Sequence, residues 1–154
     1  MITLPQTDVL LVEDGDEYLL SLQPLPGGPR WTQAKNASQA KAHLVRTSYA
    51  GVVLDMRFDR SPRGDLVGDL QQVARELGGD MDRAYKHLAQ HQGLYILAEL
   101  RAQGWQGPAL IAYDFSRELR RFEMLRQLHG PLEWIGDDAT VATWLSKLGQ
   151  WLPN

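Results

Sequence analysis

The stretch GVVLDMRF (51–58) places one carboxylate, Asp55, at the end of a short and continuous apolar run. A run of this kind is typical of a strand in a parallel sheet that is buried on both faces. A charged acid is costly inside such a core. Its place at the carboxyl end of the strand therefore favours a functional role for Asp55, and the rest of the chain decides which other groups meet it there.

Short apolar runs alternate with helical patterns along the chain. This alternation predicts right-handed crossovers and a parallel sheet covered by helices on both faces. Five strands in 154 residues fit one α/β domain, 1–154, with a flavodoxin-like, doubly wound sheet of strand order 2-1-3-4-5. The predicted strands are 8–12, 30–34, 51–56, 108–113 and 132–135, and helices are predicted at 16–22, 38–47, 117–128 and 139–152.

The segment that follows the third strand is longer than a minimal crossover requires. We interpret residues 59–92 as a helical insertion between the third strand and the third helix. An apolar stripe over 66–77 predicts one helix, which ends at two glycines. Asp80 or Asp82 then caps a second helix that runs to Gly104. The balanced charges favour a packed, solvated elaboration, and the alternative is a surface for a partner or for self-association.

Composition excludes several classes of protein. The net charge of −3 and the isoelectric point of about 5.8 give no bulk attraction for nucleic acid. The absence of cysteine excludes disulfides and thiolate metal sites, and is expected of a cytoplasmic protein. We expect neither a signal peptide nor a membrane span. His87 and His91 have the spacing of metal ligands on a helix, but no third ligand accompanies them, so we expect no metal there.

Acids follow the first strand as well as the third. Glu13 and Asp14 come directly after strand 8–12, which neighbours the strand of Asp55 in the predicted order. We therefore expect the three carboxylates to converge, and converging acids raise one another's pKa unless a cation neutralises them. Oxygen ligands suit Mg²⁺, and with Mg²⁺ bound a carboxylate oxygen of Asp55 can attack a phosphoryl donor. The alternative is three solvated loop acids.

At these residues the sequence resembles the receiver domain of bacterial two-component response regulators. The resemblance implies that Asp55 is the phosphoacceptor and that Glu13 and Asp14 hold Mg²⁺, with the backbone carbonyl of Arg57 as a further ligand. It also implies a switching surface formed by the fourth helix, the fifth strand and the fifth helix. The matching pieces are VLLVEDGDEYLL (9–20), AGVVLDM (50–56), GLYILAELRAQGWQGPALIAYD (93–114) and GPLEWIG (130–136).

The sequence departs from this family at two positions near the expected site. The family has Thr or Ser at the end of the fourth strand, where this chain has Tyr113. The family has Lys after the fifth strand, where this chain has Asp137, and the change replaces a stabilising positive charge with a negative one. Trp134 occupies the position of the family's switching aromatic residue, and the alternative for it is simple packing.

Arginines are frequent in the predicted helix 117–128. Such a row is either a solvated face or a surface that docks an acidic partner, since arginine is enriched at interfaces. The residues are Arg117, Arg120, Arg121 and Arg126.

Two functional hypotheses follow. The first is a receiver-like signal transduction domain whose partner is a histidine kinase, a phosphotransfer protein or an effector. The second is a pseudo-receiver that acts as a protein–protein interaction module without phosphorylation. Under either hypothesis, the alternative partner is a second copy of the chain, which would form a homodimer through the switching surface or through the insertion. No effector follows the last predicted helix, as expected of a stand-alone signalling protein or a fragment of a longer one.

We expect no enzyme beyond self-phosphorylation at Asp55. A Mg²⁺-dependent phosphohydrolase of the haloacid dehalogenase-like family would have a second acid two residues further on, where this chain has Arg57.

Overall fold

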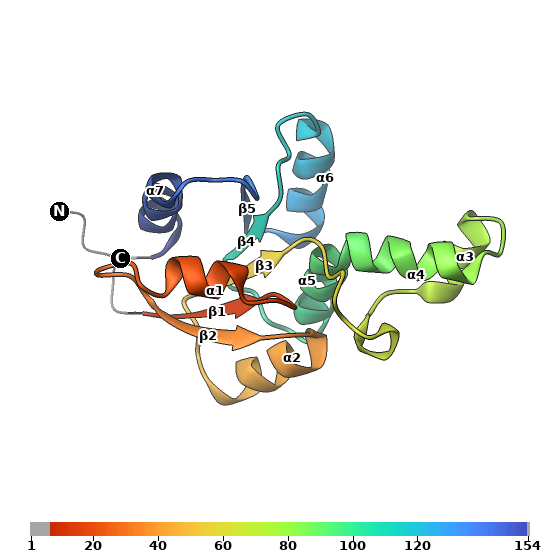
Figure 1. Ribbon diagram of the computed structural model, residues 1–154, viewed down its shortest axis with the longest axis horizontal. Helices are drawn as coiled ribbons and strands as arrows, with labels where there is room; N and C mark the ends of the chain where they lie inside the picture. The colour runs from red at the N-terminus through yellow and green to blue at the C-terminus, as the bar shows by residue number, and fades with distance from the viewer. Residues whose placement is uncertain (1–6, 154) are drawn as a thin grey trace.

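The computed structural model describes residues 7–153, and its centre is one sheet of five parallel strands. The strand order is β2-β1-β3-β4-β5, which confirms the predicted doubly wound order (Figure 1). The strands are β1 (Asp8–Val12), β2 (Arg30–Ala34), β3 (Gly51–Asp55), β4 (Ala109–Ala112) and β5 (Leu132–Ile135).

The three central strands are buried on both faces, as their continuous apolar sequences predict. Asp55 is the last residue of β3 and lies opposite Ala112 of β4 in the sheet register. The two neighbouring strands, β1 and β4, are also among the most apolar segments of the chain, so Asp55 stands at the edge of the most deeply buried part of the core.

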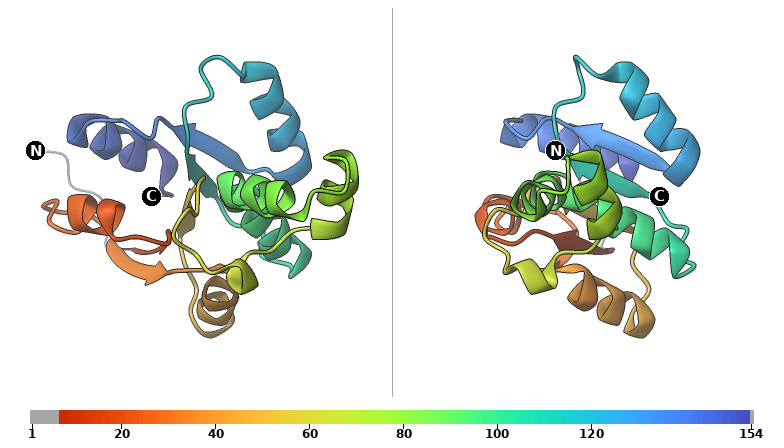
Figure 2. Two further views of the ribbon diagram at one scale, coloured as in Figure 1. Left: turned by 45° about the vertical axis from the view of Figure 1, so that its right-hand side comes forward. Right: turned by 90° about the vertical axis from the view of Figure 1, so that its right-hand side faces the viewer.

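Helices cover the sheet in two layers (Figures 1 and 2). On one face, α1 (Glu17–Leu22) and α7 (Val141–Trp151) pack around Leu22, Trp144 and Leu148. On the other face, Ala40, Leu97 and Phe122 belong to a core built with three further helices. These helices are α2 (Ala37–Arg46), α5 (Gln92–Ala102) and α6 (Leu119–His129).

The predicted insertion is present between β3 and α5, but the first predicted helix, 66–77, is wrong at its start. A short 3₁₀ turn, η1 (Arg63–Asp65), comes first, and α3 spans Leu70–Glu76. Gly68 has φ 128°, which no α-helix contains. The carboxylate of Asp69 then accepts a hydrogen bond from Gln72 N at 3.0 Å and starts the helix.

The second helix of the insertion starts where predicted but ends earlier. Asp80 caps α4 (Met81–Gln90) by accepting a hydrogen bond from Arg83 N at 3.1 Å. The predicted continuous helix to Gly104 is wrong, because α4 ends at Gln90 and α5 begins at Gln92. The backbone of Gly93 bonds to Met56 O at 3.0 Å, so contact with the end of β3 sets the direction of α5.

The helices α3 and α4 form an arm with its own small core of Val73, Ala74, Ala84 and Leu88. Figure 1 shows this arm extending away from the sheet, on the side to which the arrowheads of β1 and β2 point. The arm therefore begins beside the edge of the sheet where Asp55 lies. Within residues 7–153, no helix is long and apolar enough to cross a membrane.

Candidate functional site

A cleft of about 440 Å³ lies at the carboxyl ends of β1, β3 and β4. Its walls come from α1, the loop after β3, the segment after β5 and the start of α7. Acidic side chains outnumber basic ones in the lining, so the charge of the cleft favours binding of a cation or of a ligand that contains a cation. The charged lining residues are Asp14, Glu17, Asp55, Arg57, Asp59, Arg60 and Asp137.

Asp55 is half-buried in this cleft. Burial, followed by the negative charges of Asp14 and Glu13, raises the pKa of its carboxyl group to about 7. Hydrogen bonds from the backbone N–H groups of Met56 and Arg57 act in the opposite direction. The carboxylate is therefore held in place by the backbone while its negative charge is poorly compensated.

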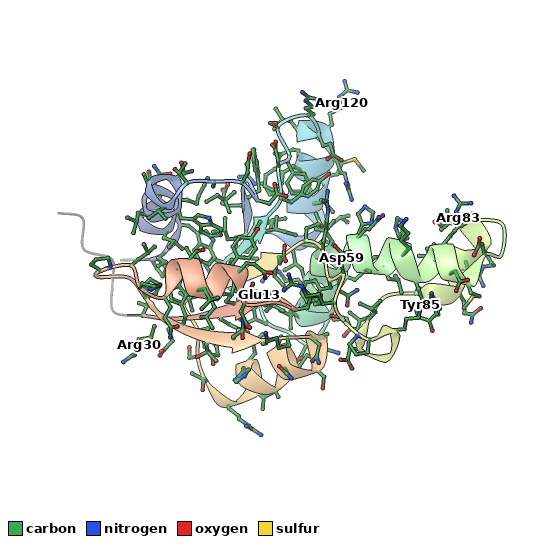
Figure 3. The ribbon with its side chains drawn as sticks, in the orientation of Figure 1. Glu13, Arg30, Asp59, Arg83, Tyr85 and Arg120 are labelled. Atoms are coloured by element: carbon green, nitrogen blue, oxygen red, sulfur yellow. The ribbon has the colours of Figure 1, made fainter. Side chains whose placement is uncertain are left out.

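Glu13 does not line the cleft, although the sequence predicted that it would converge with the other two acids. Its side chain is 1% exposed and lies against the start of α1 (Figure 3). Its two carboxylate oxygens accept hydrogen bonds from Tyr18 N at 3.1 Å and Leu19 N at 2.9 Å, and Gln33 Nε2 donates a third at 3.2 Å. Burial raises the pKa of Glu13, and these hydrogen bonds oppose that rise. In the structure, Glu13 therefore fixes the start of α1 beside the cleft.

Asp14 does line the cleft. One of its oxygens, Oδ2, accepts a hydrogen bond from Arg60 N at 2.7 Å and a longer one from Ser61 Oγ at 3.5 Å. In residues 7–153, no group of three or more His, Cys, Asp and Glu side chains is placed to hold a metal ion. Mg²⁺ commonly takes one or two carboxylates and fills its remaining positions with water. The pair of Asp14 and Asp55 fits that donor set.

The loop after β3 brings two arginines to the cleft. Arg60 forms an ion pair with Glu17 of α1, and the two side chains pass over Gly15, where a Cβ atom would collide with both. The guanidinium of Arg57 lies 6.0 Å from the centre of the Tyr113 ring. Sequence reasoning missed Glu17, Asp59 and Arg60, and the available signal was their position four or five residues after a strand of the site.

A second, smaller cleft of about 310 Å³ adjoins the first and shares Arg57 and Asp59 with it. Tyr113 lines this second cleft, and its hydroxyl donates a hydrogen bond to Glu118 Oε2 at 2.5 Å. Asp137 lines the first cleft and makes no hydrogen bond or ion pair within the described part of the chain. The two residues that depart from the family pattern thus lie in adjoining clefts that meet at Arg57.

Trp134 is half-buried and packs against two phenylalanines of the core. The ring centres lie 6.1 Å from Phe115 and 6.5 Å from Phe122. Trp134 is thus packed in the structure, and its role as a switching residue stays a prediction.

The arginines of the α6 region lie near several exposed apolar side chains. Arg121 pairs with Glu118 and Arg126 pairs with Glu123, whereas Arg120 lies at the far end of the helix from the sheet (Figure 3). The exposed apolar residues on this helix are Leu119, Met124 and Leu128.

No protein-family model matches the sequence, and no curated protein matches it significantly. Solved structures do match over nearly the whole chain. The Francisella response regulator 1452 receiver domain has a TM-score of 0.62 and 12% identity, covering 94% of this chain and 95% of that chain. The adenylate cyclase structure from Rhodopirellula baltica has a TM-score of 0.62 and 11% identity, covering 95% and 87%.

A third match is the receiver domain of the sensor histidine kinase PA1611 from Pseudomonas aeruginosa. It has a TM-score of 0.58 and 17% identity, covering 96% of this chain and 98% of that chain, and it has a magnesium ion coordinated in its active site cleft. At these identities the likeness concerns the fold. The chain has the fold of response-regulator receiver domains, with the α3–α4 arm added after β3.

Proposed function

We propose that this chain is a receiver-like signalling domain in which Asp55 accepts a phosphoryl group. The observation that carries the proposal is the position of Asp55, half-buried at the end of β3 and in the same cleft as Asp14. The receiver fold and the magnesium ion in the cleft of the PA1611 domain support the same reading. Mg²⁺ would be held by the carboxylates of Asp14 and Asp55 and by the backbone carbonyl of Arg57.

The chemistry at Asp55 is a phosphoryl transfer. One carboxylate oxygen forms a bond to phosphorus while the bond from phosphorus to the donor atom breaks, and the electron pair of that bond stays with the donor. Where the donor is a histidine ring of a partner, its nitrogen then takes a proton from solvent. The N–H groups of Met56 and Arg57 orient the carboxylate, and a bound Mg²⁺ would supply positive charge that the cleft lacks.

The alternative is a pseudo-receiver that binds partners without phosphorylation. Two features favour it. Asp137 adds negative charge where a positive charge would stabilise the phosphoryl group, and the Tyr113 hydroxyl is already engaged by Glu118. Neither feature removes the Asp14–Asp55 pair, so we keep phosphorylation as the first proposal.

The partner that this function requires is a protein. A histidine kinase or a phosphotransfer protein would supply the phosphoryl group, and an effector would receive the signal, in a cytoplasmic setting. Met124 and Leu128, both exposed and one turn apart on α6, offer an apolar surface for such a partner or for a second copy of the chain.

The experiment that tests this proposal is a titration with Mg²⁺ and then with beryllofluoride, a mimic of the acyl phosphate, followed by amide NMR. We expect shifts at residues 14 and 55 that spread to 113–137, and no beryllofluoride response in Asp55→Asn. Binding of Mg²⁺ without a beryllofluoride response would favour the pseudo-receiver. No response to either would refute the proposed site.

A further inference from the structure

The cleft contains a cationic side chain, Arg60, that can supply the positive charge which Asp137 does not. We propose that Arg60 pairs with the phosphoryl group on Asp55, and that it does so by leaving Glu17. This inference rests on the proposed function and names the residue that neutralises the added charge.

Arg60 is anchored at the cleft through its backbone, and its side chain is held by one exposed ion pair, with Glu17. Its N–H donates to Asp14 Oδ2 at 2.7 Å, so the main chain of residue 60 is held directly beside a carboxylate of the site. The guanidinium reaches over Gly15 to Glu17. The Arg60 and Glu17 side chains fill the space above Gly15, which is available to them because residue 15 has no Cβ atom. Rotation of the guanidinium away from Glu17 leaves the backbone of residue 60 in place.

The charges in the cleft leave few other candidates. Arg57 and Arg60 are the cationic side chains in its lining, and Arg57 is turned toward Tyr113 and the second cleft. No lysine or histidine lines the cleft within the described residues, and Asp137 is negative. A phosphoryl group at Asp55 would add negative charge in the cleft that Asp14 also lines, and Arg60 is the cationic residue whose backbone is bonded to Asp14 there.

The ion pair that Arg60 now makes is one that a phosphoryl group can outcompete. Both side chains of the Arg60–Glu17 pair are 62% exposed, and exposed pairs contribute little to stability because water screens them. A phosphoryl group carries more charge than one carboxylate and offers three oxygens, which suit the planar fork of a guanidinium. Exchange from Glu17 to the phosphoryl group is therefore favourable.

The loop of Arg60 is also connected to the arm. Phe58 N donates to Ala89 O of α4 at 2.8 Å. Arg63 forms an ion pair with Asp82 at 3.0 Å, and its guanidinium lies 4.5 Å from the centre of the Tyr85 ring. Residues on both sides of Arg60 in the loop therefore contact α4, the helix of the arm on which Figure 3 shows Tyr85.

The test is a beryllofluoride titration in the presence of Mg²⁺, compared across four variants of the full chain. We expect Arg60→Gln to weaken apparent binding about ten-fold, which is typical for loss of one charge-assisted contact. Arg60→Lys restores part of the affinity. Glu17→Gln strengthens binding by roughly three-fold, because it removes the carboxylate that competes for Arg60. Arg83→Gln, an exposed arginine on the arm, is the matched control and leaves binding unchanged.

The NMR signal of the Arg60 guanidinium provides a second readout, and we expect it to shift when beryllofluoride binds the wild-type chain. Opposite effects of Arg60→Gln and Glu17→Gln cannot arise from a general loss of folding. Wild-type binding that neither variant changes would overturn the role of Arg60 and leave the proposed function intact. A wild-type chain that binds Mg²⁺ but no beryllofluoride would overturn both.

Discussion

Gly93, in the first turn of α5, packs directly against the backbone carbonyl of Asp55. A Cβ atom at position 93 would overlap with that carbonyl and lie 3.1 Å from Met56 Cα. The N–H of Gly93 also donates to Met56 O at 3.0 Å. The end of β3 is therefore held by the start of a helix that lies nearly forty residues further along the chain.

Replacement of this glycine should disturb both folding and the site. Because the overlapping atoms belong to backbone, Gly93→Ala forces α5 away from β3, and we expect a loss of about 1–3 kcal/mol in the free energy of unfolding. Urea denaturation measures this loss. Gly64→Ala is the control, since a Cβ atom there meets nothing within 4 Å. Equal stability of the two variants would show that the packing at Gly93 is looser than the structure indicates.

The raised pKa of Asp55 predicts a pH-dependent stability in metal-free buffer. The carboxyl group has a pKa of about 7 in the folded chain and 3.8 as a model value for the unfolded chain, so the folded state binds more protons between these values. Stability of the wild-type chain should therefore fall as the pH rises from about 4 to about 7. Asp55→Asn removes this cost, and we expect it to be more stable than wild type by about 2–4 kcal/mol at pH 8 and equally stable at pH 4.

Thermal or urea unfolding of both proteins across this range, with a chelator present, checks the prediction. A stability difference that does not change with pH would contradict it. Addition of Mg²⁺ should reduce the difference at pH 8, because a bound cation favours the ionised carboxylate.

Glu13 and Asp14 are adjacent in sequence, but the structure predicts different consequences for their loss. Glu13→Ala leaves the N–H groups of Tyr18 and Leu19 without their acceptor in a buried place, and we expect a loss of about 2–3 kcal/mol. Asp14→Ala, near solvent, should cost less than about 1 kcal/mol but abolish the response to Mg²⁺.

Urea denaturation and an Mg²⁺ titration of both variants separate the two roles. The reverse pattern would be a loss of stability in Asp14→Ala and a loss of Mg²⁺ binding in a fully folded Glu13→Ala chain. It would mean that Asp14 is the acid that fixes α1 and that Glu13 is the Mg²⁺ ligand.

A lysine in place of Asp137 should strengthen the site. Asp137 lines the cleft and has no partner within residues 7–153, so Asp137→Lys replaces an uncompensated negative charge with a positive one. We expect beryllofluoride to bind about ten-fold more tightly in the presence of Mg²⁺. Asp138→Lys is the matched control, because the neighbouring residue does not line the cleft. An equal gain in both variants would indicate a general effect of net charge.

The fold itself was largely predictable from local sequence patterns. The apolar runs that predicted β1, β3 and β4 are the strands that the structure buries on both faces, and the alternation with helices predicted the order of the sheet. These features depend on residues that are close in sequence. The same holds for the start of α4, where the sequence offered Asp80 or Asp82 as the cap after two glycines and the structure uses Asp80.

The parts that sequence reasoning missed depend on contacts between distant residues. The helix predicted from Asp80 to Gly104 is broken at His91 because Gly93 must meet the end of β3, and no local pattern carries that information. Arg60 meets Glu17 only because the loop after β3 returns across α1.

The sequence by itself determined that an acid stands at the carboxyl end of a buried strand and that two more acids follow the neighbouring one. The tertiary structure decided which of them face the cleft. Glu13 turns toward the N–H groups of α1, because a buried carboxylate needs donors, whereas Asp14 and Asp55 remain at the opening. Strand order follows from apolar pattern, but the direction of each carboxylate follows from which hydrogen-bond donors the folded chain brings to it.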